Sequence, residues 1–204
     1  MTTSVQPWWR AFKREHWIIF IAASLAWLFD CFEQQFFNLA RDSAMEDLLR
    51  DKARATEYAT YTTSVFLVGW ALGGLIFGAL GDRFGRARML TVSVLNYSLC
   101  TGLSAFATGF ASFCGFLFFT GIGVGGIFGL AVALVADSIP DETRAPALGL
   151  LQALSTWGNI AAGLIGIGIG WLAVRQLLPL GLKPWQAVFL VGAAPALLAV
   201  FVLA

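Results

Sequence analysis

The chain has 204 residues, of which 58% are hydrophobic and 12% are charged, and its formal net charge is +1. This composition lies outside the range of soluble domains and predicts a membrane protein. The near-neutral charge argues against a nucleic-acid partner. The three cysteines all fall in apolar stretches and form neither a disulfide framework nor a metal motif.

Six apolar segments reach the roughly 20 residues that a transmembrane helix needs. They cover residues 17–39, 62–81, 89–109, 112–136, 147–172 and 184–204. We therefore predict an all-α membrane protein with six transmembrane helices, both ends on one side, and an extracytoplasmic loop over 40–61 that contains a short amphipathic helix. A cleaved signal peptide is the alternative for the N-terminus, but the first apolar run is too long and carries two acids where cleavage would occur.

The first apolar segment carries Asp30 and Glu33 inside the expected hydrocarbon region. An acid at the bilayer centre costs about 2.5 to 3.5 kcal/mol on insertion scales, so such acids indicate function. At about 100° per residue, one arc of roughly 140° holds both acids together with small, polar and aromatic residues. The other members of this arc are Ala23, Ala26, Trp27, Gln34, Phe37 and Asn38. We expect the arc to line a wet cavity.

Asp30 and Glu33 are predicted to lie about 5 to 6 Å apart, and their repulsion at an effective dielectric of about 20 is roughly 3 kcal/mol. Both should not be ionised at the same time, so the pair is expected to hold one exchangeable proton near neutral pH. This favours a proton-coupled carrier. Two alternatives remain open: a static pair satisfied by hydrogen bonds, and direct solute binding without proton coupling.

Between the second and third apolar segments lies a basic, glycine-rich stretch over residues 78–88. Its spacing is Gly, three residues, Asp-Arg, one residue, Gly-Arg, one residue, Arg, and these positions are filled by Gly78, Asp82, Arg83, Gly85, Arg86 and Arg88. The stretch resembles the loop between helices 2 and 3 of the major facilitator superfamily, in which glycines allow close helix approach and charges lie at the membrane surface. An ordinary positive loop is the alternative, although it needs no such spacing.

The turn after the fourth segment continues the resemblance, because Asp137 is followed by Pro140, which stops the helix, and by Arg144. The resemblance implies a charge cluster that latches the bundle in its outward-facing state. Its members would be Asp82, Asp137, Arg83, Arg86 and Arg144. Simple solvation of the surface is the alternative, because exposed ion pairs are each worth only about 0 to 1 kcal/mol. Lys and Arg are divided almost evenly between the two predicted sides of the membrane, so their distribution does not determine the orientation. The resemblance places both termini in the cytoplasm.

The fifth segment carries one uncharged polar arc, formed by Gln152, Ser155, Thr156, Asn159 and Gly163. These residues are candidates for hydrogen bonds to a polar solute, and contacts between helices are the alternative. Glycine pairs four residues apart predict further packing faces. They are Gly69/Gly73, Gly74/Gly78, Gly121/Gly125, Gly125/Gly129 and Gly166/Gly170. The sequence has no zinc, Walker or nucleophile-elbow motif, so we predict no enzyme activity, no cofactor and no metal.

The acid pair in the first helix is similar to that of the proton-linked metabolite, aromatic-acid and sialate carriers of the superfamily. This resemblance implies that Asp30 titrates and that Glu33 modulates it. Two positions depart from the family. Leu117 stands where the family commonly has an arginine, which excludes coupling through that arginine, and the fifth helix lacks the glycine-proline motif of antiporters, which favours symport.

We therefore predict that residues 1–204 form the N-terminal six-helix half of a twelve-helix carrier in the cell membrane, with the C-terminal half missing because the chain is a fragment. The predicted function is proton-coupled symport of a small polar or anionic metabolite by alternating access. Its partners would be the solute, a proton, membrane lipid and the missing half. The predicted substrate cavity comprises Trp27, Gln34, Phe37, Asn38, Gln152, Thr156 and Asn159. A sugar or polyol carrier and a non-transporting six-helix module remain alternatives.

Overall fold

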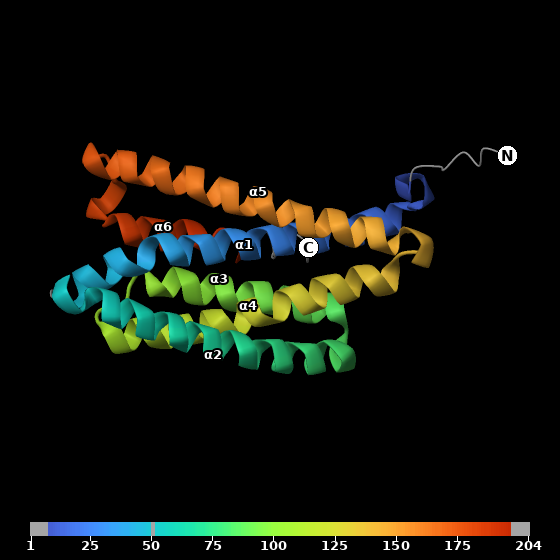
Figure 1. The fold of residues 1–204 in the computed structure, drawn as a ribbon, viewed down its shortest axis with the longest axis horizontal. Helices are drawn as coiled ribbons and strands as arrows, with labels where there is room; N and C mark the ends of the chain where they lie inside the picture. The colour runs from blue at the N-terminus through green and yellow to red at the C-terminus, as the bar shows by residue number, and fades with distance from the viewer. Residues whose placement is uncertain (1–7, 50–51, 197–204) are drawn as a thin grey trace.

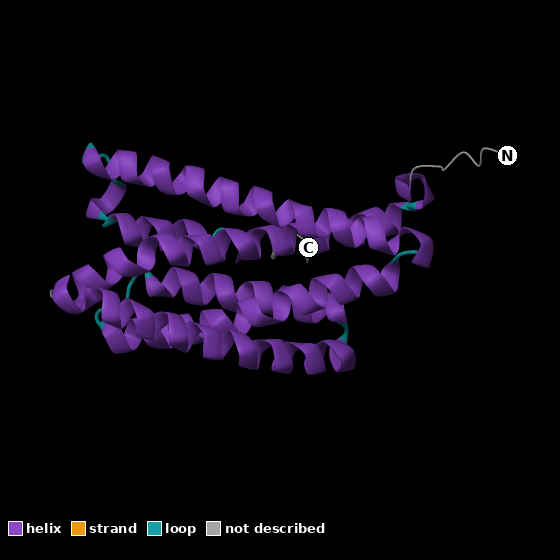
Figure 2. Ribbon diagram, in the orientation of Figure 1, coloured by secondary structure: helices purple, strands orange, loops and turns teal. Residues whose placement is uncertain are grey.

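The computed structural model describes residues 8–49 and 52–196, and all regular structure within them is helical (Figures 1 and 2). Six α-helices and two short 3-10 turns follow one another along the chain. The helices are α1 (Arg14–Leu49), α2 (Lys52–Phe84), α3 (Arg86–Ser104), α4 (Phe110–Ser138), α5 (Asp141–Val174) and α6 (Pro184–Gly192), and the turns are Trp8–Ala11 and Pro179–Gly181. The predicted all-α class is confirmed.

Four helices are long and apolar enough to cross a membrane: α1, α2 from Ala53 onward, α4 and α5. Helix α3 has 19 residues, and α6 is described over only 9 residues. The end of the predicted sixth segment, residues 197–204, lies outside the described residues. The structure therefore supports a multi-pass membrane protein, with four spans identified by length and composition.

Residues 40–61 were predicted to form an extracytoplasmic loop with a short amphipathic helix. All the described residues of this segment are helical, and they continue the two neighbouring helices instead of forming a separate short one. Helix α1 continues to Leu49 and α2 begins at Lys52. The inner side of both extensions is apolar and buried, at Ala40, Ala44, Met45, Ala55 and Ala59. Since the segment is amphipathic, it lacks the continuous apolar run of a span, yet it still packs as helix. Helix α1, with 36 residues, is about 54 Å long, well beyond the roughly 30 Å of a bilayer core.

Helix α1 lies in the middle of the bundle in Figure 1, with α5 and α6 on one side and α2, α3 and α4 on the other. The α2–α3 and α4–α5 turns lie at the same end as the N-terminus. Gly85 makes the first of these turns with a φ of 96°, a backbone conformation that residues with a side chain rarely adopt. Pro140 precedes the first residue of α5 and ends the α4 hydrogen-bond ladder, as predicted.

Helices α2 and α4 touch through their backbones. A Cβ atom at Gly69 or Gly73 would overlap the carbonyl oxygen of a residue in α4, and a Cβ at Gly121 or Gly125 would overlap one in α2. The packing prediction for these two pairs is confirmed. Each of the other three predicted pairs packs through one member only. A Cβ at Gly74, Gly125 or Gly166 would meet a neighbouring helix, whereas there is nothing within 4 Å of a Cβ at Gly78, Gly129 or Gly170.

Candidate functional site

The two acids of α1 are both buried inside the bundle, and each side chain belongs to a residue that is 1% exposed. Over residues 8–49 and 52–196, no ion pair reaches either of them. The α4 position where an arginine would be expected from the family is Leu117, which is fully buried and apolar. Asp30 and Glu33 therefore lie in an interior that offers hydrogen bonds but no neutralising cation.

Asp30 has one hydrogen-bond donor in the described structure. Gln34, one helical turn further along α1, donates from its Nε2 to Asp30 Oδ2 at 2.9 Å. The other oxygen, Oδ1, is buried and has no hydrogen-bond partner among the described residues. Gln34 itself is partly exposed, so its amide lies between the buried acid and the surface of the bundle.

Glu33 has a different set of neighbours from Asp30. Thr101 of α3 donates its hydroxyl to Glu33 Oε1 at 2.7 Å. The second oxygen faces α6, where a Cβ at Gly192 would lie only 2.8 Å from Oε2. Gly192 thus leaves the space that the carboxyl group occupies. The structure separates the two acids, one toward Gln34 and the other toward α3 and α6.

Helix α3 brings polar side chains to this interior that the sequence patterns did not single out as site residues. Ser93, Ser98, Thr101 and Ser104 are all buried at 0% exposure. Tyr97 is also fully buried and lies within electrostatic range of both acids. Thr101 lies 68 positions from Glu33 in the chain, and no local spacing links residues so far apart.

The arc of α1 that was predicted to line a wet cavity has a buried part, which other helices cover, and a part that is more exposed. Ala23, Asp30, Glu33 and Phe37 are at most 3% exposed, because other helices cover this side. Phe37 stacks on Phe66 of α2, with ring centroids 4.9 Å apart and an interplanar angle of 21°. The assignment of Phe37 to the substrate cavity is therefore wrong for this structure, since its ring is a packing group between helices.

The rest of the predicted cavity face of α1 is open to different degrees. Asn38 is exposed, and Trp27 and Gln34 are partly exposed. Trp27 packs against Phe128 of α4 with ring centroids 4.6 Å apart, and its indole Nε1 has no hydrogen-bond partner in the described part of the chain. Phe128 is 44% exposed, so the junction of α1 and α4 reaches the surface here.

The polar stripe of α5 lies at the surface of the described bundle. Gln152, Thr156 and Asn159 are exposed. Helix α5 instead faces α1 with Gly158, whose missing Cβ leaves room for the carbonyl oxygen of Leu28. One member of the stripe, Ser155, is partly buried beside Cys31 of α1. The side chains of Gln152, Thr156 and Asn159 are exposed, so their amide and hydroxyl groups are available to a solute or a further helix.

The predicted cytoplasmic charge cluster is smaller than expected. Arg86 bridges two acids, with Asp82 at 3.3 Å and Asp137 at 3.0 Å, and so ties the start of α3 to the ends of α2 and α4. Arg83 instead lies over the ring of Phe84 at 5.4 Å. Arg144 pairs with Asp141, three residues earlier in α5, at 2.6 Å. A long side chain takes the nearest acid, and for Arg144 that acid is on its own helix.

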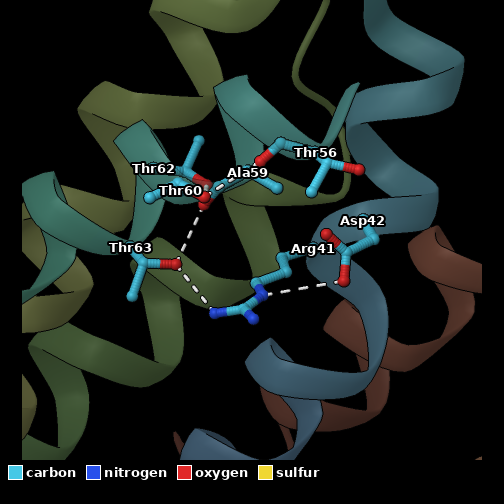
Figure 3. A network of polar contacts seen from close by, with 7 residues as sticks. All are labelled: Arg41, Asp42, Thr56, Ala59, Thr60, Thr62 and Thr63. Atoms are coloured by element: carbon cyan, nitrogen blue, oxygen red, sulfur yellow. Dashed lines mark hydrogen bonds and ion pairs between the residues drawn. The ribbon is translucent and has the colours of Figure 1, made fainter. Parts of the chain in front are cut away.

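At the opposite end of the bundle, two polar links hold the extension of α1. Arg41 donates to Thr63 of α2 at 2.9 Å and lies 3.8 Å from Asp42, while the Thr63 hydroxyl donates to the carbonyl of Ala59 (Figure 3). Asp47 pairs with Lys183 and accepts a hydrogen bond at 3.2 Å from Trp185 Nε1, which joins α1 to the start of α6. These residues fall in or next to segments predicted to be loops, and no sequence pattern pointed to these contacts.

Comparison with known proteins agrees with this architecture. The family model of the Major Facilitator Superfamily matches residues 42–204. The niacin transporter NiaP of Acinetobacter baylyi is 32% identical over 185 residues, which cover 89% of this chain and 38% of that protein. The cis,cis-muconate transport protein of the same organism is 31% identical over 183 residues, covering 90% of this chain and 41% of the relative.

Among solved structures, the inward-open xylose transporter XylE from E. coli superposes with a TM-score of 0.77 at 19% sequence identity, covering 92% of this chain and 47% of that one. This likeness concerns the fold alone. The chain spans about two fifths of the length of the curated relatives reported above.

Proposed function

Because the chain belongs to the major facilitator superfamily, we propose that it forms the N-terminal half of a secondary active transporter that carries a small organic acid together with a proton. Two relatives are named for niacin and for cis,cis-muconate, which are both organic acids, and this supports the solute class. A second bundle of similar size would supply the other half of the solute site, as in carriers built from structural repeats.

The observation that carries the proposal is the burial of Asp30 without a cation. A carboxylate isolated in an apolar interior binds a proton rather than stay charged, because the cost of burying an unpaired charge is large. Among the described residues Asp30 has a single donor, the amide of Gln34, and no basic side chain. An acid with so few partners exchanges a proton when its surroundings change, and this is what coupling requires.

The charge cluster around Arg86 is the proposed cytoplasmic gate. It ties α2, α3 and α4 together at the end of the bundle where the N-terminus also lies. In this proposal both termini are cytoplasmic, and the cluster favours the outward-facing state of the complete carrier. The contacts lie within this half, so in this proposal rocking opens the cluster by moving the start of α3 relative to the ends of α2 and α4, since such pairs at a surface are individually weak.

The test is Asp30→Asn in the complete carrier, defined as this chain together with the second bundle, in proteoliposomes. We expect the variant to lose proton-driven accumulation of nicotinate or cis,cis-muconate but to keep part of its solute counterflow, because the site is fixed in a neutral form. Glu46→Gln is the matched control, since Glu46 is an exposed acid on the same helix. Unchanged proton-driven uptake by Asp30→Asn would overturn the assignment.

One observation favours a second candidate, a carrier of a neutral polyol. The exposed stripe of Gln152, Thr156 and Asn159 has amide and hydroxyl groups but no charge, which suits a solute rich in hydroxyls. Xylose therefore belongs in the same uptake assay. Saturable xylose uptake without uptake of either acid would establish this candidate instead.

A further inference from the structure

Gln34 lies between the buried Asp30 and the surface of the bundle. It donates to Asp30 Oδ2 at 2.9 Å, while Asp30 is 1% exposed and Gln34 is partly exposed. No other hydrogen bond to Asp30 exists in the described part of the chain. Any change in the charge of Asp30 is therefore felt first by the Gln34 amide.

The amide group of glutamine has two unlike ends. Its NH2 group can only donate hydrogen bonds, and its carbonyl oxygen can only accept them. An ionised Asp30 needs a donor, so the NH2 group turns inward and the carbonyl oxygen turns toward the surface. A protonated Asp30 has its own O–H donor, which pairs with the amide oxygen, and the NH2 group then turns outward.

We propose that Gln34 relays the protonation state of Asp30 to an anionic solute by rotating its amide group. The inference rests on the proposed function and specifies its solute as a carboxylate. With a proton on Asp30, the outward NH2 group donates to the solute carboxylate. Without the proton, the outward carbonyl oxygen repels it. Proton binding and anion binding thereby favour each other, which is the linkage that symport needs.

The surroundings of Gln34 suit a planar anion. Trp27, two turns before Gln34 on the same side of α1, has an indole N–H without a partner in the described structure and packs against Phe128. Asn38, one turn after Gln34, is exposed and carries a further amide. The Trp27 N–H is buried, but the exposed amide of Asn38 and the partly exposed rings of Trp27 and Phe128 lie along one line with Gln34 and can contact a carboxylate and a ring.

Other titratable groups near Asp30 are few in the described structure. Glu33 and Cys31 belong to α1, and Tyr97 comes from α3. The described parts of α4, α5 and α6 place no acid or base against it, since their charged residues lie at the helix ends. Glu33 is the one other acid that could give a pH response, and its hydrogen bond runs to α3 and not to Gln34.

The test is solute affinity between about pH 6 and about pH 8, a range in which nicotinate stays ionised. In the complete carrier, nicotinate should bind about ten- to a hundredfold more tightly at the acidic end, the range expected for one hydrogen bond to a charged group. Nicotinamide, which is neutral and both donates and accepts, should show little change. This pair of solutes tests the sign of the effect without any mutation.

Gln34→Met, which keeps the length of the side chain but removes the amide, should make nicotinate affinity independent of pH. Gln35→Met, at the next position of α1, is the matched control and should keep the pH response. If Gln34→Met fails to fold, the nicotinate and nicotinamide comparison in the unmodified protein decides. Equal pH responses of the two solutes overturn the relay.

The two proposals fail in distinguishable ways. If Asp30→Asn abolishes the pH response and Gln34→Met retains it, the relay is wrong and proton coupling through Asp30 stands. If Asp30→Asn retains the pH response, the proposed function itself fails. Absence of binding of any organic acid overturns both.

Discussion

Replacement of Gly73 by alanine is expected to destabilise the bundle, whereas the same replacement at Gly78 in the same helix is not. A Cβ at Gly73 would overlap the carbonyl oxygen of Ile122 and lie 2.7 Å from its Cα. Backbone atoms cannot turn aside, so the overpacking should cost about 1 to 3 kcal/mol. At Gly78 nothing lies within 4 Å, and alanine gains up to about 1 kcal/mol over glycine in a helix. The two variants should thus differ by about 1 to 4 kcal/mol in free energy of unfolding.

The assay is reversible unfolding of the unmodified chain and the two variants in one detergent, followed by the fluorescence of its tryptophans, of which the chain has 8. Gly73→Ala should unfold first and Gly78→Ala last. Free energies of unfolding that agree to within about 0.5 kcal/mol, the range of ordinary surface substitutions, would show that α2 and α4 do not pack through their backbones. Such a result would refute the helix arrangement itself.

Two further predictions concern single polar links. Arg86→Met should change the fraction of outward-facing carrier, measured by labelling of cysteines introduced into the two vestibules. Arg83→Met should not, because Arg83 forms no bridge between helices in the described structure. Equal labelling of the two variants would show that the cluster only solvates the surface. Thr101→Val should lower the free energy of unfolding by about 1 to 3 kcal/mol, because a buried carboxyl loses its donor. Thr91→Val, which removes only a bond within α3, is its control, and equal losses would contradict the Thr101 contact.

The fold could be predicted largely from local patterns. Apolar run lengths located the helices, and two of the five glycine pairs marked faces that pack, because both signals depend on one helix at a time. Which helices these faces join was not predicted. The amphipathic helix predicted in 40–61 proved to be the extensions of α1 and α2, and this continuity was missed because a run-length criterion ends a helix where its apolar run ends. Their buried alanines, such as Ala44 and Ala55, have the helical spacing that marks a packed face.

Of the candidate site, only the two buried acids, Asp30 and Glu33, could be predicted from the sequence. A helical-wheel projection of α1 shows which residues share a side of the helix, but not how much of that side the other helices cover. Phe37 was therefore assigned to a cavity although Phe66 covers it. Thr101 and Gly192 could not be found because they reach Glu33 from helices far along the chain. Charge spacing likewise could not show that Arg144 pairs with Asp141 on its own helix.

The glycine contact between α2 and α4 has a mechanical consequence. Where two helices meet through side chains, changes of side-chain rotamer can absorb small displacements of one helix relative to the other. Here carbonyl oxygens lie directly against glycine residues, as at Gly69 and Gly121, and no side chain separates the two helix backbones. A displacement of the Phe84 end of α2 is therefore transmitted to α4 with little loss. When this bundle tilts, α2 and α4 must therefore move together as one rigid body.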